Sequence, residues 1–289
     1  MRLLLKFNLI FAVVFALGLV GCGWLSRDLL QRNAKEETFE HARLLMEKAI
    51  AVRNYTTTQI QPLLATQMKY SFLPQSVPAY AATEVLHELV RKYPEYGYKE
   101  ATLNPTNPRD KAVSWEEDIV VRFRNVDSQK ELSGERDSPT GRMLFIARPL
   151  KITNPACLVC HSTVEAAPKP MLDKYGPANG FGWNLNEVIG AQVVSVPMTV
   201  PLARAQATWE VFMLSLGGVF VAIAVVLNLM LWALVIRPVT QLSALADKVS
   251  LGDMEAPEFK ATSHDEIGVL AASFARMRRS LEQAMKMLS

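Results

Sequence analysis

The chain has 289 residues, half of them hydrophobic and 20% charged, with a formal net charge of +3. This composition excludes a disordered or acidic low-complexity protein. Because the net charge is small and no basic stripe is interleaved with aromatic residues, we expect no nucleic-acid partner. Three cysteines in a chain of this length also exclude a disulfide-rich scaffold.

Two apolar blocks hold most of the hydrophobic residues. The first, residues 7–26, contains no charged residue, and the second, residues 211–236, is interrupted only by Ser215 and Asn228. At 1.5 Å per helical residue, each block can cross a hydrocarbon core of about 30 Å. Lipid offers no partner for free backbone groups, so a crossing segment must be helical. The sequence predicts transmembrane helices at 7–26 and 209–236.

The first block has alternative interpretations. MRLLLK followed by an apolar run is also the pattern of a cleaved signal peptide. Residues 19–22, LVGC, resemble a lipoprotein processing site that would leave Cys22 as an acylated terminus. We favour a retained anchor, because the apolar run leads directly into a helix-forming stretch.

The charges beside the second block predict the orientation in the membrane. Basic residues gather on its C-terminal side, which is the cytoplasmic side of most spans. They are Arg237, Lys248, Lys260, Arg276, Arg278 and Arg279. With two spans, residues 1–6 and 237–289 would be cytoplasmic, and residues 27–208 would form a periplasmic loop of a bacterial inner-membrane protein.

The loop contains the pattern C-x-x-C-H at Cys157, Cys160 and His161, which is typical of c-type haem attachment. Two thiols at this spacing can form thioethers to one porphyrin, and the next histidine can bind its iron as the proximal ligand. A zinc site would need further ligands, and the loop holds no other cysteine. The motif also lacks the βαβ context of a thioredoxin-like pair. We therefore expect one covalent haem c per chain.

The residues alone leave the sixth iron ligand open. His41 and His87 are the other histidines of the loop, and a methionine would be the other usual ligand. The methionines of the loop are Met46, Met68, Met143, Met171 and Met198. A third possibility is an open position that a gas can occupy.

The rest of the loop predicts an α+β domain. Residues 28–61 form a helical pattern in which Ala42, Leu45, Ala49 and Val52 would face another helix, in a dimer partner or in the sensor domain. A second helix is expected at 80–93 and turns at 104–108 and 127–141. Strands are expected at 118–126, 141–152 and 188–198. The glycine-rich residues 175–183 do not match a phosphate loop, and we expect a turn that closes over the haem edge.

Three segments carry a resemblance to a known family: TLNPTNPRDKAVSWEED, CLVCHST and YGPANGFGWNLNEVIGAQVVSVPM. Over residues 30–200 the chain resembles the periplasmic c-type haem PAS-like family, which often stands beside a HAMP domain. The resemblance implies a PAS-like sheet with one haem attached through Cys157 and Cys160, and His161 as the proximal ligand. In some relatives a Cys or Met of the preceding helix is the distal ligand, which makes Met46 the leading distal candidate.

The residues after the second span predict two helices joined by a connector. Pro238 follows the span, residues 239–249 carry apolar residues at heptad spacing, and Gly252 would end this helix. A connector through Pro257 and His264 leads to a second apolar seam. That seam consists of Ile267, Leu270, Phe274, Met277, Leu281, Ala284 and Leu288. Together with Asp-Glu-Ile-Gly at 265–268, this pattern resembles a HAMP domain, which implies a parallel four-helix bundle in a homodimer.

These features favour a dimeric inner-membrane receptor that senses redox state or a small gas in the periplasm. The chain ends at Ser289 without a kinase, cyclase or methyl-accepting region, so we expect it either to act on a partner protein in trans or to be a truncated receptor. The alternative is a membrane-anchored monohaem c-type cytochrome for electron transfer, which would have no use for a HAMP relay. A haem peroxidase is disfavoured because no distal His/Arg pair stands out, and we expect a protein that is not an enzyme.

Overall fold

The structure is a computed structural model that describes residues 3–139, 141–253, 257 and 265–288. The chain divides into two compact units. One comprises residues 27–208, and the other comprises residues 1–26 together with 209–289. Each unit is described by itself.

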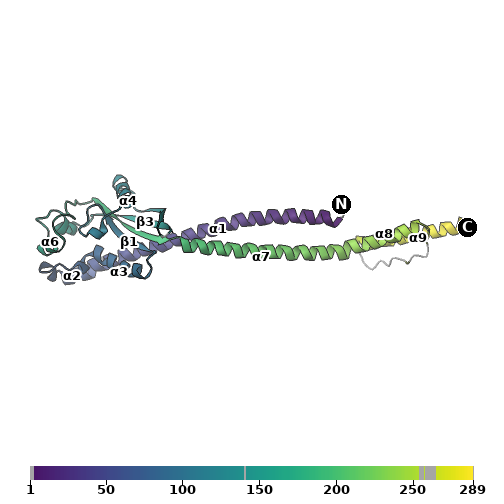
Figure 1. The fold of residues 1–289 in the computed structure, drawn as a ribbon, viewed down its shortest axis with the longest axis horizontal. Coiled ribbons are helices and arrows are strands. Elements are labelled where there is room, and N and C mark those ends of the chain that lie inside the picture. The colour runs from purple at the N-terminus through teal and green to yellow at the C-terminus, as the bar shows by residue number, and fades with distance from the viewer. Residues whose placement is uncertain (1–2, 140, 254–256, 258–264, 289) are drawn as a thin grey trace. The chain divides into compact units, whose positions relative to one another are not determined.

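Within the described part of unit 27–208, four strands form one antiparallel sheet in the order β1-β4-β3-β2 (Figure 1). The strands are β1 Gly97–Thr102, β2 Leu132–Ser138, β3 Gly141–Lys151 and β4 Val188–Pro197. The predicted α+β class is confirmed. The expected strands at 141–152 and 188–198 correspond to β3 and β4, the two central strands.

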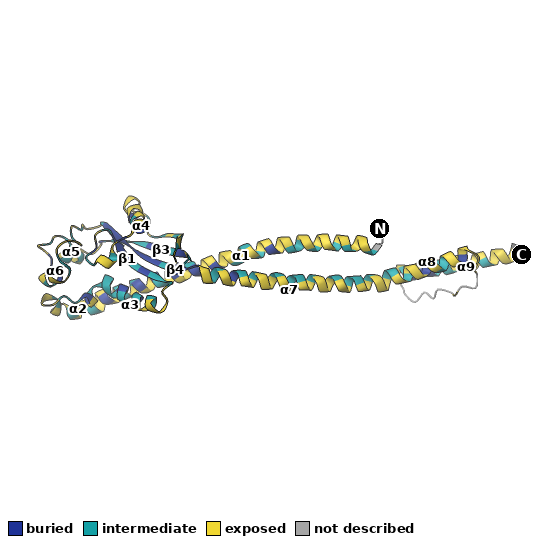
Figure 2. Ribbon diagram, in the orientation of Figure 1, coloured by how far each residue is buried: buried dark blue, intermediate teal, exposed yellow. Residues whose placement is uncertain are grey.

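Alternate residues of the strands build a core on each face of the sheet. On one face Tyr98, Ile146 and Val194 lie opposite each other in register and pack against α1 (Leu3–Tyr55) and α3 (Pro78–Lys92). On the other face, Ala147 and Val193 pack with α4 (Ser114–Asn125). Figure 2 shows β1 and β4 mostly in dark blue, as buried residues, and β3 partly in teal. The period-two alternation of a strand explains how one segment supplies both cores.

Helix α1 is continuous from Leu3 to Tyr55 and contains both the first apolar block and most of the predicted helix at 28–61. Ala42 and Ala49 are fully buried against the sheet, so this seam faces the chain's own α+β unit. Beyond Tyr55 the helix widens into a π-type turn, Thr56–Ile60, just before Pro62. Proline has no N–H to continue the α-helical ladder, which explains the change at this point.

The predicted strand at 118–126 is wrong, because these residues belong to helix α4. Its β-branched residues favour a strand by propensity. A local cap and helical spacing override that preference: Glu116 accepts a hydrogen bond from the backbone N–H of Val113 at 2.9 Å. Ile119, Val120 and Phe123 then fall on one buried face of the helix.

The interpretation of 127–141 as turns only is also wrong, and β1 was not predicted. Strand β2 lies inside 127–141 and pairs with β3 along its length. It is an edge strand with mostly polar side chains, which disfavour pairing with another chain. Such a strand lacks the alternating apolar pattern by which strands are found in a sequence. Strand β1, GYKEAT, carries a glycine and two charges and has the same weak pattern.

Short helices complete the unit. They are α2 Gln61–Leu64, η2 Gln67–Lys69, η3 Pro74–Ser76, η4 Pro108–Asp110, η5 Pro155–Cys157, α5 Leu158–His161 and α6 Lys169–Tyr175. The predicted helix at 80–93 corresponds to α3.

In the other unit, the two apolar blocks are helical. Among the described residues, two helical stretches are long and apolar enough to cross a membrane, Leu4–Leu64 and Thr199–Ser250. The second consists of α7 (Thr199–Leu231), a π-type turn η6 (Trp232–Ile236) and α8 (Arg237–Ser250). Figure 2 shows the apolar parts of α1 and α7 largely in yellow, as exposed residues.

The two apolar segments pack antiparallel to each other. Asn8 and Asn228 exchange two amide hydrogen bonds of 2.9 and 2.7 Å. Phe220 stacks on Phe15 with ring centroids 4.9 Å apart. At the opposite end the Trp209 indole N–H donates to the Gly23 carbonyl at 2.9 Å.

The region after the second apolar block has the predicted pair of helices, α8 and α9 (Glu266–Leu288). Gly252 ends α8 with a φ of +94°, a conformation that favours glycine. Asp265 caps α9 by accepting a hydrogen bond from the Gly268 N–H at 2.9 Å. The predicted connector position His264 lies outside the described residues.

Candidate functional site

The C-x-x-C-H motif forms one tight turn between β3 and β4, made of η5 and α5. The Asn154 side chain starts this turn by accepting a hydrogen bond from the Ala156 N–H at 2.9 Å. Helical spacing then brings Cys157, Cys160 and His161 to neighbouring positions on one side. Both cysteines are free thiols and half-buried, which leaves them available for thioether bonds.

The His161 ring is held in one tautomer. Its Nδ1 atom lies 2.7 Å from the Gly180 carbonyl oxygen, which can only accept a hydrogen bond, so Nδ1 carries the proton. Nε2 then carries the free lone pair that a metal needs. The ring also stacks on Trp183 with centroids 3.9 Å apart and an interplanar angle of 15°. The orientation of the ring is therefore fixed by a carbonyl and by an aromatic plane.

Burial favours the neutral forms of His161 and Cys160. Burial lowers the pKa of His161, against the opposing effect of the Gly180 carbonyl, so the neutral imidazole that binds metals is the stable form. Burial, with a smaller contribution from Cys157, raises the pKa of the Cys160 thiol. The site therefore favours a neutral His161 imidazole beside a protonated Cys160 thiol.

Two loops interlock around His161. Gly180 has a φ of +88°, and its N–H donates to the Asn104 side-chain oxygen at 3.3 Å. A Cβ atom on Gly180 would collide with Thr106, whose hydroxyl oxygen lies 3.5 Å from His161 Nδ1. The backbone N–H of Trp183 donates to the backbone carbonyl of His161 at 3.1 Å. The glycine-rich segment predicted to close over a haem edge thus lies against the histidine of the motif.

This donor set fits a c-type haem. Two free thiols at the attachment spacing adjoin an imidazole whose Nε2 is left for iron, which is the chemistry of thioether attachment with proximal ligation. It does not fit a bare metal ion. Among the residues that the structure describes, no group of three or more His, Cys, Asp or Glu side chains could hold one.

The candidates for the distal ligand are spread over the domain. Met46 is fully buried between α1 and the sheet, in the core that contains Ala42 and Ala49. The Met68 sulfur accepts hydrogen bonds of 3.2 Å from the Leu73 N–H and the Ser76 hydroxyl. Met143, Met171 and Met198 are buried. The distal role of Met46 stays a prediction.

An ion pair between a buried carboxylate and a half-buried guanidinium lies in the same unit and was not predicted. Arg53, in the last turn of α1, pairs with Glu100 of β1. The contacts of Thr106, Gly180 and Trp183 with His161 were also missed. The sequence did draw attention to residues 104–108 and 175–183, but it could not say which side chain they touch.

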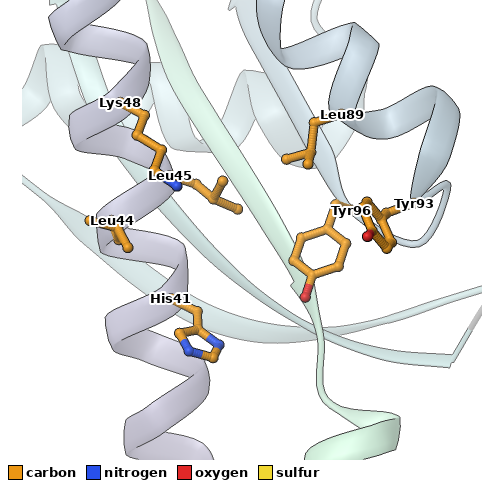
Figure 3. Close-up of a pocket in the computed structure, with 7 residues that line it drawn as sticks. All are labelled: His41, Leu44, Leu45, Lys48, Leu89, Tyr93 and Tyr96. Carbon is orange, nitrogen blue, oxygen red and sulfur yellow. The ribbon is translucent and has the colours of Figure 1, made fainter.

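A separate hollow of about 230 Å³ lies between α1 and the segment from α3 to β1 (Figure 3). It is smaller than the roughly 300–1,000 Å³ of typical cofactor sites, and none of its lining residues belongs to the motif. The residues that line it are His41, Leu44, Leu45, Lys48, Leu89, Tyr93 and Tyr96. His41 therefore belongs to this hollow, and the position predicted for the haem lies at His161.

Comparisons with known proteins match both parts of the chain. The Tll0287-like family model matches residues 31–197, and the HAMP domain model matches residues 230–283. A solved structure, that of the cyanobacterial heme protein Tll0287, shows 14% identity and a TM-score of 0.44, and the alignment covers 56% of this chain and 95% of that one. No curated protein matches. The resemblance over residues 30–200 and the resemblance to HAMP are confirmed.

Proposed function

Because the chain belongs to the Tll0287-like family, we propose that residues 27–208 form a PAS-like sensor domain that carries one covalent haem c. Cys157 and Cys160 would form the thioethers, and His161 would bind the iron as proximal ligand. Met46 is the candidate distal ligand. The bound haem would supply a one-electron redox centre and a position for small gases.

The observation that carries this proposal is the hydrogen bond from His161 Nδ1 to the Gly180 carbonyl. A proximal histidine needs its second nitrogen held by an acceptor, because this fixes the tautomer and strengthens the ligand. Trp183 would hold the plane of the ring by stacking. Thr106 and Gly180, which contact the Nδ1 atom, would limit rotation of the His161 ring.

We propose that the protein spans the bacterial inner membrane twice, at 7–26 and 209–236. The exposed apolar surface of both segments and their antiparallel pairing support this. Residues 27–208 would be periplasmic, where covalent haem attachment takes place. Residues 1–6 and the HAMP helices at 237–289 would be cytoplasmic, in agreement with the basic residues that follow the second span.

The protein would act as a homodimeric signal-transduction receptor and not as an enzyme. Three seam residues of α9, Leu270, Met277 and Leu281, are exposed in the single chain, as expected when a second copy covers them. A change in redox state or gas binding would bias the HAMP helices. These would act on a partner in trans, of the kinase, cyclase or chemoreceptor-like class.

The second candidate function is a membrane-anchored monohaem cytochrome for electron transfer. Val159, inside the motif, is 61% exposed, which would leave one edge of the haem open to an electron-transfer partner. Optical spectra of the full-length protein with and without CO and NO separate a gas sensor from a redox sensor or an electron carrier. An unchanged six-coordinate spectrum favours a redox sensor or carrier, whereas ready binding favours a gas sensor.

The haem assignment is tested by replacing both thiols. In the full-length protein, Cys157→Ala with Cys160→Ala should abolish haem staining on a denaturing gel, because no thioether can form. Cys22→Ala is the matched control and should keep full staining, since Cys22 lies in the first apolar block. Staining that survives the double substitution, or a wild-type protein without covalent haem, would overturn the proposal.

A further inference from the structure

We propose that Arg109 is a positioning residue for the histidine of the motif. Anchored on helix α3, it would hold the loop of residues 103–111 against the segment 180–183, which in turn fixes the His161 ring. This inference rests on the proposed haem site and concerns how firmly its proximal ligand is held.

The loop of residues 103–111 is closed at its base but has little hydrophobic support further out. The Ala112 N–H donates to the Thr102 carbonyl at 3.0 Å and joins the two ends of the loop. Among residues 104–110, all of which the structure describes, only Pro105 is buried. The position of this outer part therefore depends mainly on its polar contacts.

One side of the loop contacts the segment beside His161. The Asn104 side chain accepts a hydrogen bond from the Gly180 N–H and donates one to the Phe181 carbonyl, both of 3.3 Å. The Thr106 hydroxyl oxygen lies 3.5 Å from His161 Nδ1. The Gly180 carbonyl, which fixes the tautomer of His161, thus belongs to a residue that the loop holds.

The other side of the loop is anchored on α3 by the Arg109 guanidinium. Its Nη1 atom lies 2.5 Å from the Glu84 carboxylate, and its central carbon lies 4.8 Å from the centroid of the Tyr80 ring. Tyr80 and Glu84 are four residues apart, so they lie on one face of the helix. The Asn107 side chain accepts a hydrogen bond from the Arg109 N–H at 3.2 Å and fixes the turn η4. The loop is thereby tied to a helix that packs in the hydrophobic core.

A positioning role explains this anchor better than a contribution to overall stability. The side chains of Arg109 and Glu84 are 30% and 37% exposed, and an ion pair so open to water adds little to the stability of a whole domain. The same small free energy can decide how often a loop with few buried residues opens locally. Such an opening would break the contacts of Asn104 with Gly180 and Phe181.

Opening of the loop should also change the haem. An imidazole whose Nδ1–H is bonded to a carbonyl is a stronger ligand, and a stronger donor favours the oxidised, more positive iron. When the Gly180 carbonyl is held less firmly, this bond weakens. Loss of the anchor should therefore loosen the segment 180–183 and favour reduced haem.

The first measurement is amide hydrogen exchange of the segment 180–183 in the full-length protein in detergent. We expect Arg109→Met and Glu84→Gln each to speed this exchange, on the order of threefold to fivefold. The double variant should be no faster than either single variant, because both substitutions remove the same contact. Arg109→Lys keeps the charge and should stay near the wild-type rate. Exchange in β4 should not change.

The second measurement is the ratio of oxidised to reduced haem at a fixed ambient potential. If Arg109 acts by positioning, Arg109→Met and Glu84→Gln should both lower this ratio, on the order of twofold. A direct effect of charge on the haem would move the two variants in opposite directions, because one removes a positive charge and the other a negative charge. The sign of the two shifts therefore separates positioning from an electrostatic effect.

Arg91→Met is the matched control. Arg91 lies on the same helix and pairs with Glu88 of that helix at 2.9 Å. The inference is overturned if Arg109→Met speeds exchange of 180–183 no more than Arg91→Met does, or speeds exchange in β4 equally. Opposite shifts of the haem ratio, or a ratio that does not move, also overturn it.

Two further results keep the test decisive. If Arg109→Met does not fold, Glu84→Gln is judged by the same criteria. Amide exchange needs no haem, so it tests the anchor whether or not haem staining supports the proposed site. Haem present with unchanged exchange refutes only the positioning role.

Discussion

The two units of the chain bury polar groups in opposite ways. In the sensor unit the buried polar groups include full charges, and each has partners from several elements, as Glu100 has from Arg53 and Tyr98. In the unit with the apolar segments, the connecting polar pair is neutral and reciprocal, Asn8 with Asn228. The core of a soluble domain can bury a charge when its partners are fixed in place. In an apolar environment such as lipid, burying a neutral polar pair costs much less free energy than burying a charge.

The two units also differ in how much their contacts depend on backbone groups. Around His161, backbone groups of the glycine-rich segment 175–183 both donate and accept hydrogen bonds. Between the apolar segments, side chains on regular helices make the contacts, in one case with the backbone carbonyl of Gly23. The sensor unit should therefore be sensitive to single backbone changes, and the apolar pair should tolerate substitutions that keep its polar groups matched.

The largest effect is expected at Gly180. Gly180→Ala places a Cβ where it meets Thr106 and imposes a φ of +88° on a residue that disfavours it. We expect a loss of about 2–4 kcal/mol of stability, together with reduced haem attachment. Thermal denaturation of the full-length protein and haem staining measure the two effects.

Gly176 offers the control for this substitution. Its φ is +77°, but a Cβ there would meet no other atom within 4 Å. Gly176→Ala should cost only the backbone strain, about 1 kcal/mol, and should keep the haem. Equal losses at both glycines would show that strain alone matters and that Thr106 does not hold the segment.

A smaller effect is expected at Asp110, which tests how well the sensor unit compensates its buried charges. Burial raises the pKa of Asp110 to about 6, with Glu100 and Glu84 adding to the rise and Arg109 and Lys99 opposing it. Between this value and the ordinary one near 3.8, the folded state binds more protons than the unfolded state. The penalty of the charge is thus present above about pH 6 and disappears as the pH falls.

Asp110→Asn should therefore raise stability at pH 8 by about 1–2 kcal/mol, with a gain that shrinks towards pH 4. Thermal denaturation of the two proteins across this range measures the gain. Asp137→Asn is the control, because the Asp137 side chain is 90% exposed, and its curve should run parallel to that of the wild type. A variant that loses stability equally at both pH values would show that Asp110 is needed as a structural acceptor.

Much of the architecture could be predicted because it depends on local patterns. The apolar blocks, α3, α8 and the motif at 157–161 each follow from residues within a few turns of one another. The errors have the same physical origin. Helix α4 depends on the Glu116 cap, which outweighs the strand propensity of its β-branched residues, and β2 is an edge strand without a hydrophobic face.

The site could be predicted only as far as the motif itself. The groups that orient His161 lie 19 and 55 residues away, at Gly180 and Thr106, and Arg53 lies 47 residues from Glu100. Such contacts depend on how the elements pack in space, which the spacing of residues in one segment does not determine. The sequence did mark both loops as turns rich in glycine and proline.

The smallest effect is expected at the Asn8–Asn228 pair. The ranking of its variants by stability tests how the unit with the apolar segments buries polar groups. Asn228 also donates to the Ala224 carbonyl of its own helix at 2.8 Å, so it keeps one partner when Asn8 is removed. Asn228→Leu should therefore cost more than Asn8→Leu, within about 0.5–2 kcal/mol. The double variant should recover most of the loss, since no amide is left unmatched in an apolar setting.

The thermal midpoints of the three variants in detergent give this order. Ser215→Ala is the control, because among the contacts described the Ser215 hydroxyl bonds only the Val211 carbonyl of its own helix. A double variant less stable than either single one would mean that the pair contributes net attraction, and the polar pairs of the two units would then follow the same rule.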